Sequence, residues 1–207
     1  MNTLENFIVD ASKYPTAWLG HGKFAIQLVA ELKPKTIVDL GVDFGFSTFC
    51  FAYPKIGYVW GIDCFEGDYH AGSKNTYAVV ISQRAILRQK YGIHNVNIVK
   101  GYFNDVAKEW ETKPDTTIDI LHIDGLHTYD ACKEDFETWG KFLSPEGVVL
   151  FHDTISFKDD VGRFFDEIPG DFKLNFQHSY GLGVWTPSEN TYEKLQQIVA
   201  NYGAISL

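Results

Sequence analysis

Residues 117–129 read Thr-Ile-Asp-Ile-Leu-His-Ile-Asp-Gly-Leu-His-Thr-Tyr, and residues 147–153 read Gly-Val-Val-Leu-Phe-His-Asp. In each stretch an apolar run of β-strand type ends in polar residues, and a helical pattern lies between the two runs. This arrangement predicts two neighbouring parallel strands. The carboxyl ends of such strands meet at one edge of the sheet, where open α/β sheets bind their ligands. We therefore expect Asp124, His127, His152 and Asp153 to lie close together.

Two carboxylates and two imidazoles at one sheet edge could bind a metal ion, carry out acid–base chemistry, or do both. The alternative is structural: Asp124 and Asp153 would cap the helices that follow them, and the histidines would be ordinary surface residues. A cap is a sufficient explanation for one aspartate alone. Four polar residues at the ends of paired strands favour a functional site.

Outward from this pair, the chain alternates helical and strand patterns without repeats. Expected helices lie near Thr3–Ser12, Lys23–Leu32, Ser47–Ala52, Asn75–Tyr91 and Thr191–Tyr202, and further strands near Thr36–Leu40, Tyr58–Ile62 and Asn95–Val99. Asp171–His178 and Leu182–Thr186, joined by Ser-Tyr-Gly, predict an antiparallel hairpin. The expected fold is an α/β, Rossmann-like three-layer sandwich: a seven-stranded, mostly parallel sheet with a C-terminal antiparallel hairpin. This element order is typical of the class I methyltransferase architecture.

Composition sets the size and the environment of the expected domain. The chain has 207 residues, 45% of them hydrophobic, which is enough for a full core. We expect a single domain over residues 1–207, with N-terminal helices in 1–34 and the Rossmann-like core in 35–207. The helix before residue 147 carries Cys132, Phe136, Trp139 and Leu143 at core-facing spacing.

Charge and cysteine content exclude several classes of partner. The net charge is −9 and no block of lysine or arginine occurs, which disfavours nucleic acids and anionic membranes. The three cysteines lack metal-site spacing and suit reduced thiols. No apolar run reaches the length of a membrane span, and residues 1–20 do not resemble a signal peptide. The expected location is the cytoplasm.

The segment after the first expected strand indicates the cofactor. It reads Asp39-Leu-Gly-Val-Asp-Phe-Gly-Phe-Ser47, so glycines at 41 and 45 allow a tight turn close to a ligand. Asp43 stands where a dinucleotide fingerprint has its second glycine, and a carboxylate there would repel pyrophosphate. The ammonium and sulfonium groups of S-adenosylmethionine suit an acidic loop better. Asp63, at the end of the next strand, is placed to accept hydrogen bonds from ribose hydroxyls, and Ser47 could cap the following helix.

Several motifs resemble one known family. They are Asp63-Cys-Phe-Glu-Gly-Asp-Tyr-His-Ala-Gly72, Leu121-His-Ile-Asp-Gly-Leu-His-Thr-Tyr129, Asp135-Phe-Glu-Thr-Trp139 and Gly147-Val-Val-Leu-Phe-His-Asp-Thr154, continued by Arg163-Phe-Phe-Asp-Glu-Ile168 and Tyr180-Gly-Leu-Gly-Val184. Together they are similar to a bacterial, glycosyltransferase-associated family of class I S-adenosylmethionine-dependent methyltransferases, related to macrocin-type sugar O-methyltransferases. The resemblance covers about residues 35–186.

The resemblance implies roles for the polar cluster. Carried over, it makes Asp124 and Asp153 ligands of a divalent ion, magnesium or manganese, and His127 a general base. The chain departs from these relatives at His152, where they carry Glu or Asp. Magnesium prefers oxygen ligands, so an imidazole in that position weakens the case for magnesium or favours a softer ion. The expected metal ligands are Asp124, His152 and Asp153.

Two further segments border the expected site. The loop Cys64–Ser73 reads either as a lid over the cofactor and acceptor or as an ordinary polar loop, and the resemblance favours the lid. Phe65 could pack on the adenine or on the sheet, and Gly101–Asp105 either closes around the adenine or caps a helix. The expected cofactor-binding residues are Gly41, Asp43, Gly45, Ser47, Asp63, Phe65, Gly101, Phe103 and Asp124. His21, His94 and His178 stand alone in the sequence and read as structural or exposed.

The expected function is methyl transfer from S-adenosylmethionine to the hydroxyl of a small molecule. His127, Asp124 and His152 are the expected catalytic residues, with His127 removing the hydroxyl proton. The resemblance implies a carbohydrate acceptor, with a phenol or catechol second, and its members often form homodimers. Two alternatives remain: a nicotinamide-dependent oxidoreductase, opposed by the missing glycine and the hairpin, and a non-catalytic binding module on the same fold.

Overall fold

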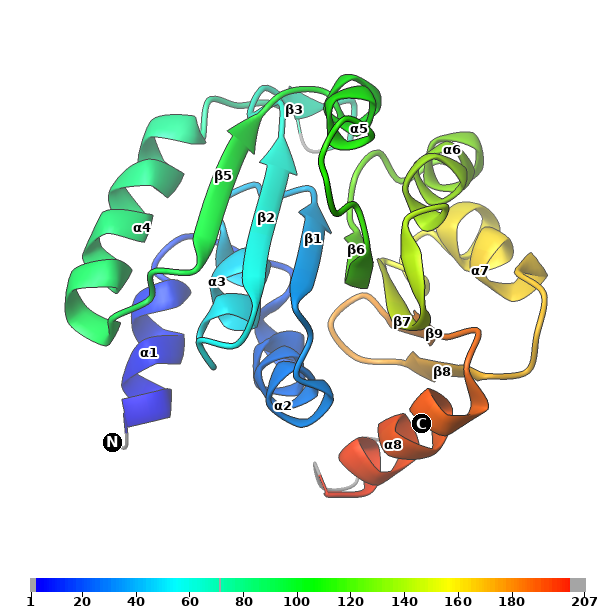
Figure 1. The fold of residues 1–207 in the computed structure, drawn as a ribbon. Helices are drawn as coiled ribbons and strands as arrows, with labels where there is room; N and C mark the ends of the chain where they lie inside the picture. The colour runs from blue at the N-terminus through cyan, green and yellow to red at the C-terminus, as the bar shows by residue number, and fades with distance from the viewer. Residues whose placement is uncertain (1–2, 71, 202–207) are drawn as a thin grey trace.

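The computed structural model describes residues 3–70 and 72–201, and within them the chain forms a seven-stranded sheet (Figure 1). The strand order is β5-β2-β1-β6-β7-β9-β8. In chain order the strands are β1 (Thr36–Leu40), β2 (Tyr58–Asp63), β5 (Val96–Lys100), β6 (Ile118–Ile123), β7 (Leu143–His152), β8 (Lys173–Phe176) and β9 (Leu182–Trp185). The first five are parallel, whereas β9 pairs antiparallel with both β7 and β8. The predicted parallel sheet with its terminal hairpin is confirmed.

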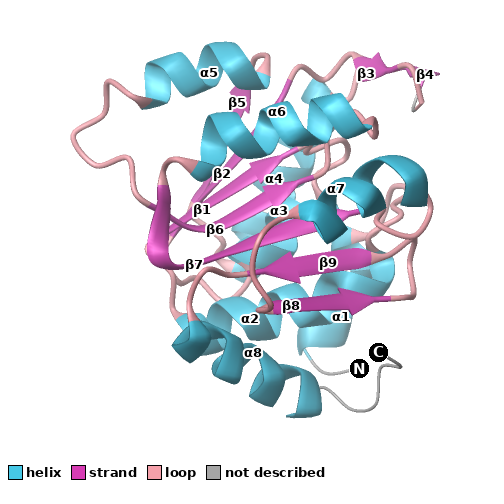
Figure 2. Ribbon diagram, turned by 90° about the vertical axis from the view of Figure 1, so that its right-hand side faces the viewer, coloured by secondary structure: helices cyan, strands magenta, loops and turns pink. Residues whose placement is uncertain are grey.

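Helices cover both faces of this sheet and make three layers (Figure 2). The helices are α1 (Thr3–Ala11), η1 (Leu19–His21), α2 (Gly22–Leu32), α3 (Phe46–Ala52), α4 (Tyr77–Tyr91), α5 (Phe103–Trp110), α6 (Tyr129–Gly140), η2 (Lys158–Gly162), α7 (Arg163–Glu167) and α8 (Glu189–Asn201). The core has two parts, one on each face: α1 to α4 and α8 pack on one, and α5, α6 and α7 on the other. No helix of this described part is long and apolar enough to cross a membrane.

The apolar runs become strands because both of their faces are buried. In β1, Ile37 packs into one half of the core and Val38 into the other, and both are fully buried. This is the pattern expected for a parallel sheet covered by helices on both sides. The second helix ends as expected, since Lys33 takes a left-handed conformation (φ 52°) directly before Pro34.

The structure differs from the sequence expectation at the start of one strand and within one loop. The strand β7 begins at Leu143 rather than at Gly147, since Leu143 pairs with Ile118 before a register shift; exposed Pro145 and Glu146 concealed this part of the strand. Within Cys64–Ser73, expected as a loop, β3 (Gly67–Asp68) and β4 (Gly72–Ser73) form a short antiparallel hairpin. The last helix was expected to reach Tyr202, which lies outside the described residues.

Candidate functional site

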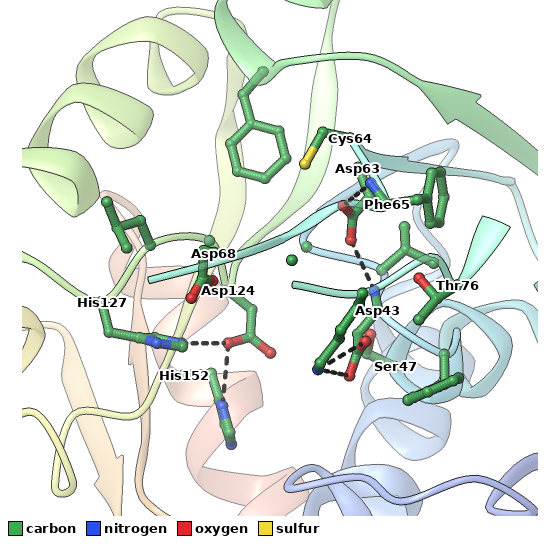
Figure 3. Close-up of a pocket in the computed structure, with 18 of the residues that line it drawn as sticks. Asp43, Ser47, Asp63, Cys64, Phe65, Asp68, Thr76, Asp124, His127 and His152 are labelled. Atoms are coloured by element: carbon green, nitrogen blue, oxygen red, sulfur yellow. Dashed lines mark hydrogen bonds and ion pairs between the residues drawn. The ribbon is translucent and has the colours of Figure 1, made fainter. Parts of the chain in front are cut away.

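The four polar residues at the ends of β6 and β7 come together as expected. Figure 3 shows three of them, Asp124, His127 and His152. His127 Nε2 lies 3.3 Å from Asp124 Oδ1 and 2.9 Å from Asp153 Oδ2. His152 Nδ1 lies 3.3 Å from the same Asp124 oxygen and 3.1 Å from Asp153 Oδ2. The capping alternative fails for Asp124, because Thr128 caps α6 by accepting a hydrogen bond from the Ala131 amide.

This cluster holds both imidazoles in their charged form. Burial lowers the pKa of His127, but hydrogen bonds to Asp124 and Asp153 and their charges outweigh it and raise the pKa to about 10. Burial also lowers the pKa of His152, but the charges and hydrogen bonds of Asp124 and Asp153 outweigh it and raise the pKa to about 10. Burial alone would raise the pKa of both carboxyl groups, yet the imidazoles lower it, for Asp124 to well below its usual range. Two imidazolium and two carboxylate groups therefore balance one another, and His127 carries a proton near neutral pH.

A backbone carbonyl fixes the orientation of His152. Its Nε2 lies 3.1 Å from the Ser179 oxygen, so this nitrogen donates and Nδ1 faces the two carboxylates. A metal-ligating histidine commonly has its second nitrogen held in this way. One donor atom each from Asp124, His152 and Asp153 lie within 4.8 Å of one another. The geometry fits a divalent ion, and the mixed nitrogen and oxygen donors suit manganese better than magnesium.

Two histidines that stand alone in the sequence, His21 and His178, lie next to this cluster. His21 is fully buried, its ring centroid 5.6 Å from that of His152 and 4.6 Å from that of His178. Its Nε2 shares the Ser179 carbonyl with His152. Burial lowers the pKa of His21 to about 3, so this imidazole stays neutral beside the charged pair.

A cavity of about 490 Å³ connects the cluster to the glycine-containing loop. The cavity is lined by every expected site residue except Gly45, namely Gly41, Asp43, Ser47, Asp63, Phe65, Gly101, Phe103, Asp124, His127, His152 and Asp153. Gly45 instead caps α3 with φ +91°, and a Cβ there would lie 2.5 Å from the Phe49 ring. Its contribution is to the turn rather than to the cavity wall.

Gly41 brings the backbone of the loop against the end of β6. A Cβ added at this position would lie 1.9 Å from the Asp124 carbonyl oxygen, and its φ of +97° is unfavourable for any side chain. Residue 41 therefore has to be glycine for β1 and β6 to approach each other here. This close contact places the loop beside Asp124, where the two halves of the cavity meet.

Asp63 holds the neighbouring loops in place. Its Oδ2 accepts a hydrogen bond from the Asp43 amide at 2.9 Å, and its Oδ1 accepts one from the Phe65 amide at 2.6 Å (Figure 3). Each carboxylate oxygen retains a lone pair for a ligand. Asp63 thus faces the cavity while also bridging two loops.

Asp43 is paired with a lysine that the sequence did not point to. Lys74 Nζ, directly after β4, lies 3.1 Å from both carboxylate oxygens of Asp43. Burial raises the pKa of Asp43 and Lys74 opposes this effect. This ion pair links the β3–β4 hairpin to the glycine-containing loop, and both of its side chains line the cavity.

Ser47 and Phe65 have local roles that correct two expectations. Ser47 does not cap α3; its hydroxyl donates to the buried Asp39, which also contacts Thr48 and His122. The ring of Phe65 packs in the core, 5.1 Å from the ring of Tyr77, and not as a free face for adenine. Asp39 is structural, since its partners are the side chains of Ser47, Thr48 and His122.

The β3–β4 hairpin borders the cavity through Gly67 and Asp68. Behind it, Phe157 stacks on His127 with centroids 4.7 Å apart, and His70 lies 4.9 Å from Phe157. Aromatic rings therefore form one wall beside the charged cluster. This placement is compatible with the expected lid.

The cavity also has lining residues that sequence reasoning missed: Pro15–Trp18, Phe44, Lys74, Thr76, Leu126, Ala131, Glu134 and Asp135. Of these residues, Asp135 is the one whose position in the sequence could have been noticed. It stands three residues after Cys132 and four before Trp139, on the face of α6 predicted to meet the core. A carboxylate on such a face is unusual unless it has a purpose.

Sequence comparison places this geometry among known proteins. Residues 38–154 match the model of a family described as a methyltransferase domain. The uncharacterized protein y4gI of Sinorhizobium fredii is 36% identical over 177 residues, which cover 82% of this chain and 19% of that protein. The chain thus spans about a fifth of the length of this curated relative.

Two solved structures share the fold. The O-methyltransferase from Bacillus cereus, in complex with S-adenosylhomocysteine, is 18% identical, with a TM-score of 0.62 and 88% of each chain covered. The calicheamicin methyltransferase CalS11 is also 18% identical, with a TM-score of 0.60, covering 88% of this chain and 89% of that one. These likenesses confirm the predicted class I fold.

Proposed function

Because the chain belongs to the methyltransferase-domain family, we propose that it transfers a methyl group from S-adenosylmethionine to a hydroxyl oxygen of a small molecule. The observation that carries the proposal is one cavity with the Gly41 turn and Asp63 at one end and the Asp124–His127–His152–Asp153 cluster at the other. Family membership also favours a methyltransferase over an oxidoreductase.

Residues at the Gly41 end fit the donor. Gly41 lines the cavity and brings the loop backbone against Asp124, which places the loop beside the cluster. Asp63 has lone pairs for ribose hydroxyls, and Phe103 and Leu126 supply apolar surface for a base. Bound there, S-adenosylmethionine would supply an electrophilic methyl group on its sulfonium. The enzyme's main contribution is to orient donor and acceptor.

Residues at the other end fit a divalent ion and an acceptor. Asp124, His152 and Asp153 would hold the ion, and the ion would supply Lewis acidity toward an acceptor oxygen. His127 is the proposed general base, with its proton now held at Nε2 between two carboxylates. To accept a proton from an acceptor, His127 must first give up this one. His152, fixed by Ser179, orients the cluster.

The proposed acceptor class is a carbohydrate. Support comes from the motifs shared with macrocin-type sugar O-methyltransferases, and from CalS11, which is described as a TDP-rhamnose 3′-O-methyltransferase. An acceptor screen of nucleotide-linked sugars against catechols, with S-adenosylhomocysteine release as readout, tests the class. Turnover confined to catechols would refute it.

Asp63→Ala is expected to weaken S-adenosylhomocysteine binding by about 10- to 100-fold, since a hydrogen bond to a charged group contributes about 1.5–3 kcal/mol. Isothermal titration calorimetry measures the change. Asp119→Ala is the matched control, because Asp119 also accepts hydrogen bonds from two backbone amides, those of Lys35 and Thr36, but lies outside the cavity. Equal affinity in both variants would remove Asp63 from the binding site.

Manganese is expected to bind between Asp124, His152 and Asp153. An anomalous-scattering map of crystals soaked in manganese should show a peak there, and Asp153→Asn should lower manganese affinity by about 10- to 100-fold or more. Asp130→Asn, an exposed carboxylate on α6, serves as control. An empty map together with activity that survives a chelator would make the enzyme metal-independent.

A further inference from the structure

A buried carboxyl group of the cavity has no partner in the described part of the chain. Asp135, on α6, is only 8% exposed and lines the cavity beside Phe103. Its Oδ2 would lie 3.0 Å from a Cβ added at Gly125, so the group is pressed against the turn after β6. Buried polar groups are nearly always hydrogen-bonded in native proteins, so a carboxyl group that reaches a cavity without a protein partner is a candidate for contact with a ligand.

The environment keeps this group partly protonated. Burial, with a smaller effect of the Glu134 charge, raises the pKa of Asp135 to about 7. The protonated carboxyl has one hydroxyl donor and one carbonyl acceptor, about 2 Å apart. Such a pair suits a ligand edge that offers one acceptor and one donor side by side.

The nearest charged groups on the elements packed against α6 do not change this balance. Lys108 of α5 pairs with Asp105, Asp124 after β6 pairs with His127 and His152, and Asp160 of η2 accepts from the Tyr129 amide. On α6 itself, Cys132 is buried with its own pKa raised to about 12 by burial, and so stays neutral. Within the described residues, Glu134 is the one charge that shifts Asp135.

Apolar residues line the cavity around Asp135. Phe103 begins α5 and Leu126 follows β6, and both line the cavity next to this carboxyl group. Gly101 and Gly125 keep the ends of β5 and β6 free of side chains at this place. An aromatic heterocycle can lie between such apolar surfaces while its polar edge meets the carboxyl.

We propose that the Asp135 carboxyl group recognises the adenine of the cofactor through its Watson–Crick edge, donating to N1 and accepting from the N6 amino group. The inference rests on the proposed function, because it takes S-adenosylmethionine as the ligand of this cavity. It assigns Asp135 a role in specificity that Asp63 and the Gly41 turn cannot fill, since they meet the ribose and the chain beyond it.

The first test is the pH dependence of S-adenosylhomocysteine binding, measured by calorimetry from pH 6 to pH 8. Binding that needs the protonated acid is strongest below the pKa and is lost as pH rises through it, so affinity should fall about tenfold over this range. Asp135→Asn keeps a donor and an acceptor at all pH values, as amide side chains do toward adenine, and should bind with little pH dependence. Glu137→Gln, an exposed carboxylate on the same helix, should behave as the unmodified protein.

The second test changes the base. The 1-deaza analogue of S-adenosylhomocysteine has a C–H group in place of N1, so it offers no acceptor to the hydroxyl of the acid. The preference for adenine over this altered base should therefore be largest at pH 6, shrink toward pH 8, and disappear in Asp135→Leu. Thermal unfolding of each variant checks that it is folded.

The outcomes separate this inference from the proposed function. If S-adenosylhomocysteine binds with a pH-independent affinity that Asp135→Asn and Asp135→Leu leave unchanged, Asp135 does not contact the base, and the cofactor assignment stands. If the unmodified protein binds no S-adenosylhomocysteine at any pH, both the assignment and the inference are overturned.

Discussion

His127→Ala should lower kcat by about 100-fold or more while leaving the Kd of S-adenosylhomocysteine nearly unchanged, because general-base catalysis contributes about 10²–10⁴ in rate. The side chain lies at the cluster end of the cavity, 2.9 Å from Asp153, and not at the Gly41 turn. The loss should therefore appear in turnover and not in cofactor binding. Steady-state kinetics with the acceptor identified by the screen, together with calorimetry, measures both quantities.

His127→Gln separates a base from a positioning group. Glutamine can still donate a hydrogen bond to Asp153, but it cannot accept a proton at this pH. If His127 acts as a base, His127→Ala and His127→Gln should lose the same amount of activity. If His127→Gln retains most of the activity, the residue positions Asp124 and Asp153, and His152 becomes the next base to test. His94→Ala, an exposed histidine outside the cavity, is the control.

Gly41→Ala should destabilise the protein by roughly 3 kcal/mol or more and abolish measurable cofactor binding, since it combines a strained backbone with a steric clash. The added methyl group would lie 1.9 Å from the Asp124 carbonyl oxygen, a backbone atom that cannot rotate away. Either β1 and β6 separate or the turn changes shape, and both moves alter the cavity. For a domain of this size the midpoint of thermal unfolding should fall by about 6–12 °C.

Gly72→Ala is the matched control for this change. Gly72 also has a positive φ, +75°, but no atom lies within 4 Å of a Cβ added there. It therefore isolates the cost of the backbone conformation from that of the clash. If both variants lose the same stability and Gly41→Ala still binds S-adenosylhomocysteine, the close approach at residue 41 is not what shapes the binding site.

The expected fold followed from short-range signals. Apolar runs such as 36–40 and 147–151 became strands because both faces of a parallel sheet are buried, and this periodicity is visible in sequence. The approach of Asp124 to Asp153 followed from topology alone, because parallel neighbours end at the same edge. The start of β7 was missed because exposed Pro145 and Glu146 do not look like strand residues.

What could not be foreseen depended on contacts between distant segments. The proton on His127 reflects a contest between burial and two carboxylates from different strands, whose sign requires distances. His21 meets His152 only because η1 folds against the β8–β9 turn. Lys74 reaches Asp43 across 31 residues, and no local pattern marks that pair.

The pair of Lys74 and Asp43 also bears on how fast a ligand can enter. Their side chains are 28% and 45% exposed, and exposed ion pairs of this kind contribute only about 0–1 kcal/mol and weaken with salt. Since breaking so weak a link costs little free energy, we expect this pair to act on association kinetics more than on affinity. Rising ionic strength should then speed the entry of a neutral adenosine derivative. Rising ionic strength should speed the entry of a cationic derivative less, because the added ions also screen the attraction between that ligand and Asp43.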